Sequence, residues 1–136
     1  MSGAERRLGQ LLLLLAAGHV ALGLAMPFAL PWMPGVLAQM PYAESAEAAR
    51  FWSRVFGPTL AAWGMLAFFV VRHGVLRRER WGCDALILSV LCWAPLDAWL
   101  CGQAGFPAGI VLDAVVSAVI LGPALWLRQR FPAAFY

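Results

Sequence analysis

Three ionisable side chains, His19, Asp97 and Asp113, lie inside long apolar segments of this sequence. An aspartate at the centre of a lipid-embedded helix costs about 2.5–3.5 kcal/mol on insertion. Such residues therefore usually face the interior of a helix bundle or a hydrated cavity, and they are candidates for function. The chemistry they predict is ligand binding or proton transfer within a membrane.

The two aspartates fall at one level if the segments that carry them form an antiparallel hairpin. Asp97 precedes Gly105, near the centre of a short connection, by as many residues as Asp113 follows it. At about 1.5 Å per residue, that level is roughly 10 Å below the outer surface. His19 lies about 16 Å from the opposite edge of a core about 30 Å thick, so the three groups can meet in one cavity open to the outer side.

Aromatic and small polar residues extend this candidate site. Trp93 and Asp97 share a helical face with Cys101, and Asp113 is followed one turn later by Ser117. Small and polar residues let membrane helices approach closely and bond to one another. The residues predicted to bind a ligand are His19, Trp63, Trp93, Asp97, Asp113 and Ser117.

A structural role for the same residues is the alternative. One aspartate would then cap a backbone kink near Pro95, and His19 would form a hydrogen bond between helices, a contact that contributes about 0.6 kcal/mol on average in membrane proteins. If the groups instead share a cavity, low dielectric and mutual repulsion leave at least one carboxyl neutral at neutral pH. The sequence leaves the ligand site and the structural role open.

Motifs for metals, cofactors and catalysis are absent from the sequence. Cys83, Cys92 and Cys101 form no CxxC pair, and His19 and His73 belong to different membrane levels. No HExxH, GxSxG or glycine-rich phosphate loop occurs. We therefore predict no metal site, no cofactor and no assigned catalytic residue, and we interpret the cysteines as small buried apolar residues.

The elements that position these residues are predicted to be four membrane-spanning helices. Hydrophobic residues make up 62% of the 136 residues and charged residues 12%, against about 45–50% and 25% in soluble proteins. About 20 apolar residues cross a bilayer as a helix. We expect an all-α, integral membrane four-helix bundle, a single domain over 1–136, with spans at about 8–30, 56–71, 83–103 and 107–127. The first span is longer than the roughly 7–15 apolar residues of a signal peptide, so we expect it to be retained.

The distribution of arginines predicts the orientation. The chain has ten arginines and no lysine, and only Arg50 and Arg54 fall on the side of the first loop. The others flank the opposite ends of the spans, so the positive-inside rule places both termini in the cytoplasm of a bacterial inner membrane. Basic residues at span ends, rather than in a soluble patch, also exclude a nucleic-acid partner.

The stretch from Ser45 has the pattern of a helix start. Ser45 is a good N-cap, and the alanines and Glu47 that follow favour a helix. This stretch forms either a short interfacial helix before the second span or an extension of that span above the membrane.

Three runs of residues resemble a group of small bacterial four-helix membrane proteins: Phe56 to Gly64, Arg78 to Trp81, and Trp93 to Asp97. More distantly, the layout is similar to the EXPERA domain of sterol isomerase and sigma-2-receptor relatives. This resemblance implies binding of an apolar ligand through intramembrane carboxylates and aromatics, here Trp93, Asp97 and Asp113. The helix glutamates of that family have no counterpart in this chain.

The function expected from the sequence is that of a small membrane protein without enzymatic activity. It either binds an apolar or amphipathic ligand or serves as an accessory subunit, as a homo-oligomer or in a larger membrane complex. Two alternatives use the same aspartates: an enzyme acting on a lipid or isoprenoid with Asp97 or Asp113 as acid or base, and a proton-coupled transporter.

Overall fold

The computed structural model describes residues 2–29, 32–33, 35 and 45–132, apart from the side chains of residues 46, 49 and 53. Every element of regular secondary structure in this part of the chain is a helix. The helices are α1 (Gly3–Ala29), α3 (Ala46–His73), the short 3-10 helix η2 (Val75–Arg77), α4 (Arg80–Gln103) and α5 (Pro107–Arg130). The absence of strands from the described residues confirms the all-α prediction. The four long helices are each long and apolar enough to cross a membrane.

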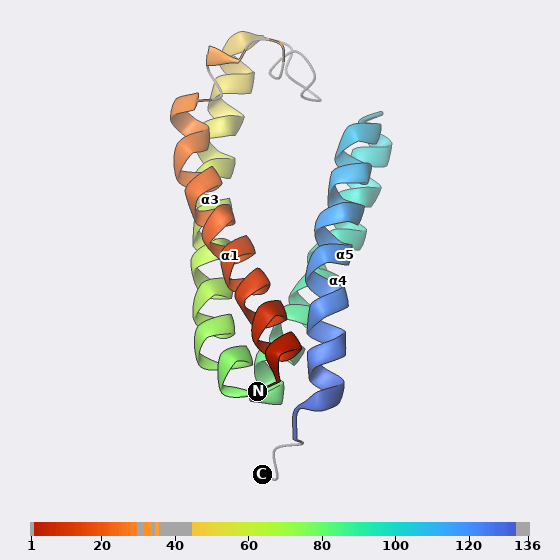
Figure 1. Ribbon diagram of the computed structural model, residues 1–136. Helices are drawn as coiled ribbons and strands as arrows, with labels where there is room; N and C mark the ends of the chain where they lie inside the picture. Colours follow the sequence, from red (N-terminus) through yellow and green to blue (C-terminus); the bar gives the residue numbers. More distant parts are fainter. Residues whose placement is uncertain (1, 30–31, 34, 36–44, 133–136) are drawn as a thin grey trace.

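The helices form two pairs, α1 with α3 and α4 with α5 (Figure 1). Both pairs meet at the end of the molecule where α1 begins, α5 ends and η2 joins α3 to α4. We call this the terminal end and the opposite one the far end. Toward the far end the two pairs diverge, so most packing there is within each pair.

Glycines bring the backbones of α1 and α3 into contact. A Cβ atom built on Gly23 would lie 2.4 Å from the backbone nitrogen of Ala61, and one on Gly64 would lie 2.8 Å from that of Val20. No side chain fits in either place. Small residues permit this close approach of membrane helices, and it makes the first pair the tighter one.

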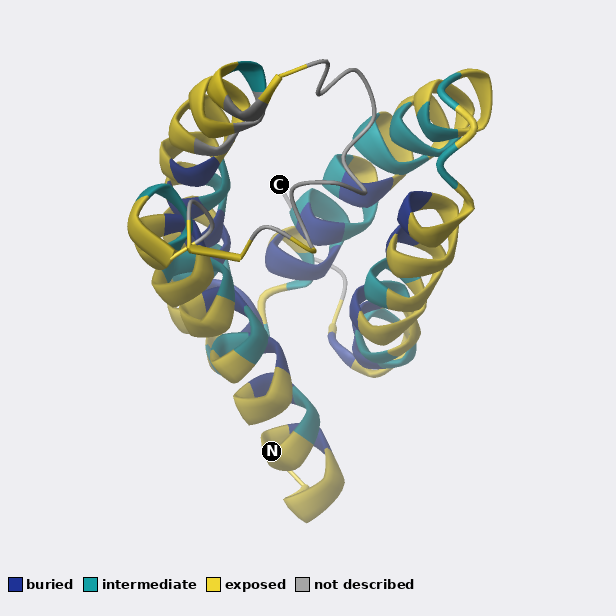
Figure 2. Cartoon of the chain, turned by 90° about the horizontal axis from the view of Figure 1, so that it is seen from above, coloured by how far each residue is buried: buried dark blue, intermediate teal, exposed yellow. Residues whose placement is uncertain are grey.

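The buried apolar core lies toward the terminal end, where all four helices meet. Seen from above, each of the four long helices carries buried residues (Figure 2). Every helix contributes to the core, and η2 closes it with Val75, which is fully buried. Its main members are Leu12, Ala16, Ala67, Val71, Val75, Cys83, Leu86, Val90, Ile120, Ala124, Leu127 and Phe131.

Polar contacts fasten the terminal end. Ser2 and Glu5 form reciprocal backbone-to-side-chain bonds at the start of α1, and Glu5 Oε1 lies 3.7 Å from Arg78 Nη2 in the loop after η2. Across the second pair, Asp84 of α4 forms an ion pair with Arg128 of α5. These contacts join the first helix to the central loop, and α4 to α5.

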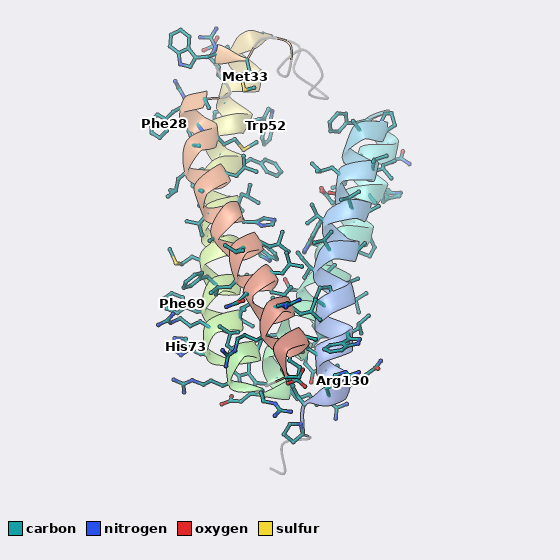
Figure 3. All side chains as sticks on the ribbon, in the orientation of Figure 1. Phe28, Met33, Trp52, Phe69, His73 and Arg130 are labelled. Carbon is teal, nitrogen blue, oxygen red and sulfur yellow. The ribbon has the colours of Figure 1, made fainter. Side chains whose placement is uncertain are left out.

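The helices run past the predicted spans. Ser45 Oγ accepts a hydrogen bond from the Ala48 nitrogen at 3.1 Å, and α3 continues from there without a break, so the stretch after Ser45 is an extension of the second span. The first helix, α1, includes Pro27 and ends at Ala29, next to the predicted end of the first span at about residue 30. Phe28, Met33 and Trp52 project at the far end, and His73 and Arg130 at the terminal end (Figure 3).

Candidate functional site

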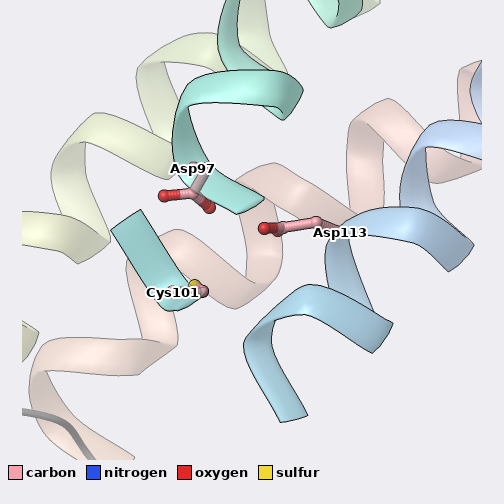
Figure 4. A group of neighbouring side chains, drawn as sticks. All are labelled: Asp97, Cys101 and Asp113. Atoms are coloured by element: carbon pink, nitrogen blue, oxygen red, sulfur yellow. The ribbon is translucent and has the colours of Figure 1, made fainter. Parts of the chain in front are cut away.

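Asp97, Cys101 and Asp113 form a compact group between α4 and α5 (Figure 4). One carboxylate oxygen of each aspartate and Cys101 Sγ all lie within 4.8 Å of one another. Asp97 and Cys101 are one turn apart on α4, and Asp113 extends toward them from α5. We call this group the carboxyl cluster.

Asp113 is the buried member of the carboxyl cluster. Only 9% of the residue is exposed, and its Oδ2 is a buried atom with no hydrogen-bond partner among the described residues. Ser117 Oγ, one turn further along α5, is also a buried atom without a hydrogen-bond partner among the described residues. Neither aspartate of the cluster has an ion pair with a basic residue in the described ranges. Because an unsatisfied buried polar group costs about 1–3 kcal/mol, these atoms require a proton, a water molecule or a ligand.

His19 and Trp63 form a second polar group, between the two helix pairs. The rings of His19 and Trp63 are 4.9 Å apart between centroids, and His19 Nδ1 lies 2.7 Å from the Leu15 carbonyl oxygen. Trp63 Nε1 donates a hydrogen bond to Ser89 Oγ on α4 at 3.0 Å. Both rings line a small cavity together with Leu12, Leu15, Ala16, Ala67, Val71, Leu86 and Ile120.

This histidine cavity is separate from the carboxyl cluster. It offers about 10 Å³ to the centre of a water molecule, which is room for one water and no larger ligand. Its walls include His19 and Trp63 but neither Asp97 nor Asp113. The structure therefore brings the two aspartates together and places His19 against Trp63 of its own helix pair.

The remaining candidates lie close to the carboxyl cluster in sequence. Trp93 is half-buried on α4, one turn before Asp97, and Ser117 is half-buried on α5, between Asp113 and the cavity residue Ile120.

Two polar participants were not among the predicted site residues. The sequence places Cys101 on the helical face of Asp97, but the cysteines were interpreted as small apolar residues, so no role in the site was predicted for its thiol. Ser89 gave no signal, because its partner Trp63 is 26 positions away in the chain. Only the packing of α3 against α4 creates that contact.

Comparisons of the chain with models of protein families, with curated proteins and with solved structures find no match. The resemblance to small bacterial four-helix proteins and to the EXPERA layout remains a prediction.

Proposed function

We propose that this chain is a multi-pass protein of the bacterial cytoplasmic membrane that binds an amphipathic ligand through a positively charged group. The observation that supports it is the carboxyl cluster, with Asp97 and Asp113 facing each other and no basic residue paired with either in the described part of the chain. A carboxylate inside a membrane is usually paired or faces a hydrated path, and carboxylates there serve as counter-ions of ligands.

The surroundings of the carboxyl cluster suit the apolar part of such a ligand. Leu96 and Leu100 on α4 and Leu112 on α5 directly precede the three cluster residues in the sequence, and each exposes between 55% and 62% of its surface. In a bilayer these side chains contact lipid tails, so an alkyl chain can lie along them while its charged end reaches the aspartates.

The orientation in this proposal places both termini in the cytoplasm. The terminal end carries Arg6, Arg7, Arg72, Arg77, Arg78, Arg80, Arg128 and Arg130, the excess expected of a cytoplasmic face. The carboxyl cluster then lies in the outer half of the membrane, and ligands reach it from the outer leaflet.

Assembly with a second copy or with another membrane protein is the second candidate function. It is favoured by the divergence of the two helix pairs, which leaves their far halves with few contacts to each other. Acid–base chemistry on a lipid and proton-coupled transport remain further proposals for the same two aspartates.

Photolabelling tests the ligand-binding proposal. The protein in lipid nanodiscs is irradiated with a photoreactive long-chain amine or with the matching alcohol. Because a charge-assisted hydrogen bond contributes about 1.5–3 kcal/mol, the doubly substituted D97N/D113N protein should bind the amine about tenfold less tightly or worse. The D84N protein, changed at the terminal end, is the control and should label like wild type.

The alcohol should label wild type and the D97N/D113N protein equally, since it carries no charge. Equal labelling of wild type and D97N/D113N by the amine would mean that the aspartates do not bind a cationic group.

A further inference from the structure

The carboxyl cluster combines two carboxylates with a thiol, which is the donor set of a metal site. Asp97 and Cys101 lie one turn apart on α4 and Asp113 faces them from α5, with one donor atom of each within 4.8 Å of the other two (Figure 4). Zinc bonds to oxygen at about 2.0–2.2 Å and to thiolate at about 2.3 Å, so tetrahedral donors are about 3.3–3.6 Å apart. Side-chain rotations that move the donors by about 1 Å close this difference.

A second observation comes from the buried carboxyl group of Asp113. Asp113 is only 9% exposed, and its Oδ2 is buried without a hydrogen-bond partner in the described residues. Its side chain extends toward α4, where Asp97 and Cys101 lie. A bound cation would satisfy this oxygen, which no described protein group does.

The thiol is held in place by the packing of the hairpin. A Cβ atom built on Gly109 would lie 2.6 Å from Cys101 Sγ and 2.6 Å from the Phe106 ring. Only a glycine at this position lets the sulfur sit against α5, one turn before Asp113. Cys101 is a free cysteine, so its sulfur is available as a ligand.

We propose that Asp97, Cys101 and Asp113 bind one divalent metal ion of the zinc class, with the fourth position open to water. This inference goes beyond the proposed function: both place a positive charge at the carboxyl cluster, but a metal ion and the charged group of an amphipathic ligand would compete for the same two aspartates. A thiolate selects zinc-class ions over Mg²⁺ and Ca²⁺, which prefer oxygen ligands only. Binding releases the thiol proton to solvent, and the ion offsets most of the charge of two carboxylates and a thiolate.

Cobalt substitution gives a direct readout of the thiolate ligand. The full chain in lipid nanodiscs is titrated with Co²⁺, and a near-ultraviolet sulfur-to-cobalt charge-transfer band should grow to one equivalent. The band should disappear in the C101S protein and persist in C92S, because Cys92 is an exposed cysteine on the same helix outside the cluster. D113N should weaken Co²⁺ binding by at least about tenfold, and Zn²⁺ should displace Co²⁺ from wild type.

The variants are also melted without metal, so that a folding defect is distinguished from the loss of a ligand. C101S that melts like wild type yet gains no stability from Zn²⁺ supports the site. Wild type that binds Co²⁺ without the charge-transfer band, or with equal affinity in C101S, overturns the proposal. If no metal binds but the photoreactive amine still labels in an aspartate-dependent way, the metal site is wrong and the proposed function stands. If neither probe binds, both proposals are wrong.

Discussion

At the scale of single residues, the interior of this protein is organised by a few polar contacts among apolar neighbours. Trp63 and Ser89 form the clearest one, since their hydrogen bond at 3.0 Å joins α3 to α4 and so links the two helix pairs. Hydrogen bonds between membrane helices contribute about 0.6 kcal/mol on average and up to about 1.7. The contact is therefore measurable but modest.

A double-mutant cycle on this pair tests the predicted link. W63F and S89A should each lower stability, and the W63F/S89A double variant should lose less than the sum of the two. We expect a coupling free energy of about 0.6 kcal/mol, measured by reversible unfolding in mixed micelles. Strict additivity would show that the indole and hydroxyl do not interact in the folded protein.

At the scale of elements, the helices of the first pair depend on glycine to pack. Gly23 and Gly64 leave no space for a side chain, whereas Gly18 of α1 has no atom of another segment near the position of a Cβ. This difference provides a matched pair of substitutions within the same two-helix unit.

G64A should destabilise the protein, and G18A should not. The added methyl group at Gly64 meets backbone atoms of α1 at 2.8 and 3.0 Å, so the helices must move apart at a cost of about 1–3 kcal/mol. At Gly18 the better helix propensity of alanine, about 1 kcal/mol, acts alone. Melting of both variants in the same detergent provides the measurement, and equal melting would contradict the packing of α1 on α3.

At the scale of the whole molecule, the terminal end holds the two helix pairs together. Glu5 of α1 is buried and pairs with Arg78 after η2, and the Arg78 guanidinium lies 5.9 Å from the centre of the Phe131 ring beyond α5. The first helix, the central loop and the end of the last helix therefore meet at one arginine.

E5Q should destabilise the protein more than D84N. The Glu5 side chain is 7% exposed and that of Arg78 is 42% exposed, so the loss is expected to be about 1–2 kcal/mol, below that of a fully buried pair. The Asp84–Arg128 pair is 37% and 38% exposed, and its removal should cost about 0–1 kcal/mol. Thermal melting of both variants compares the two pairs, and a larger loss in D84N would reverse this ranking.

The orientation of the whole molecule is also testable. In a C92S/C101S background, with Cys83 left because it is fully buried, single cysteines replace Arg77 at the terminal end or Gln103 at the far end. An impermeant thiol reagent on intact cells should label the cysteine at 103 and leave that at 77 unlabelled. Labelling of the cysteine at 77 from outside would invert the proposed topology.

The sequence by itself determined the helices and the shared level of two aspartates. Four long apolar segments permit no other element that crosses a membrane, because lipid offers no partner to backbone groups. Since the third and fourth segments are joined by a short turn, a fixed rise per residue brings Asp97 and Asp113 to one level, and the structure brings them together.

The sequence placed Cys101 on the face of Asp97, but only the tertiary structure decided that this face turns toward Asp113 and that His19 lies elsewhere. The helices α1, α4 and α5 are apolar nearly all round, so no amphipathic stripe tells which face turns inward. The rotation of α4 about its axis places Cys101 beside the aspartates, and the packing of α1 on the glycines of α3 turns His19 toward Trp63 instead. The depth of a residue along a helix follows from counting residues. The rotation of each helix about its axis, by contrast, depends on side-chain packing between segments that are distant in the chain, and so does the divergence of the two helix pairs.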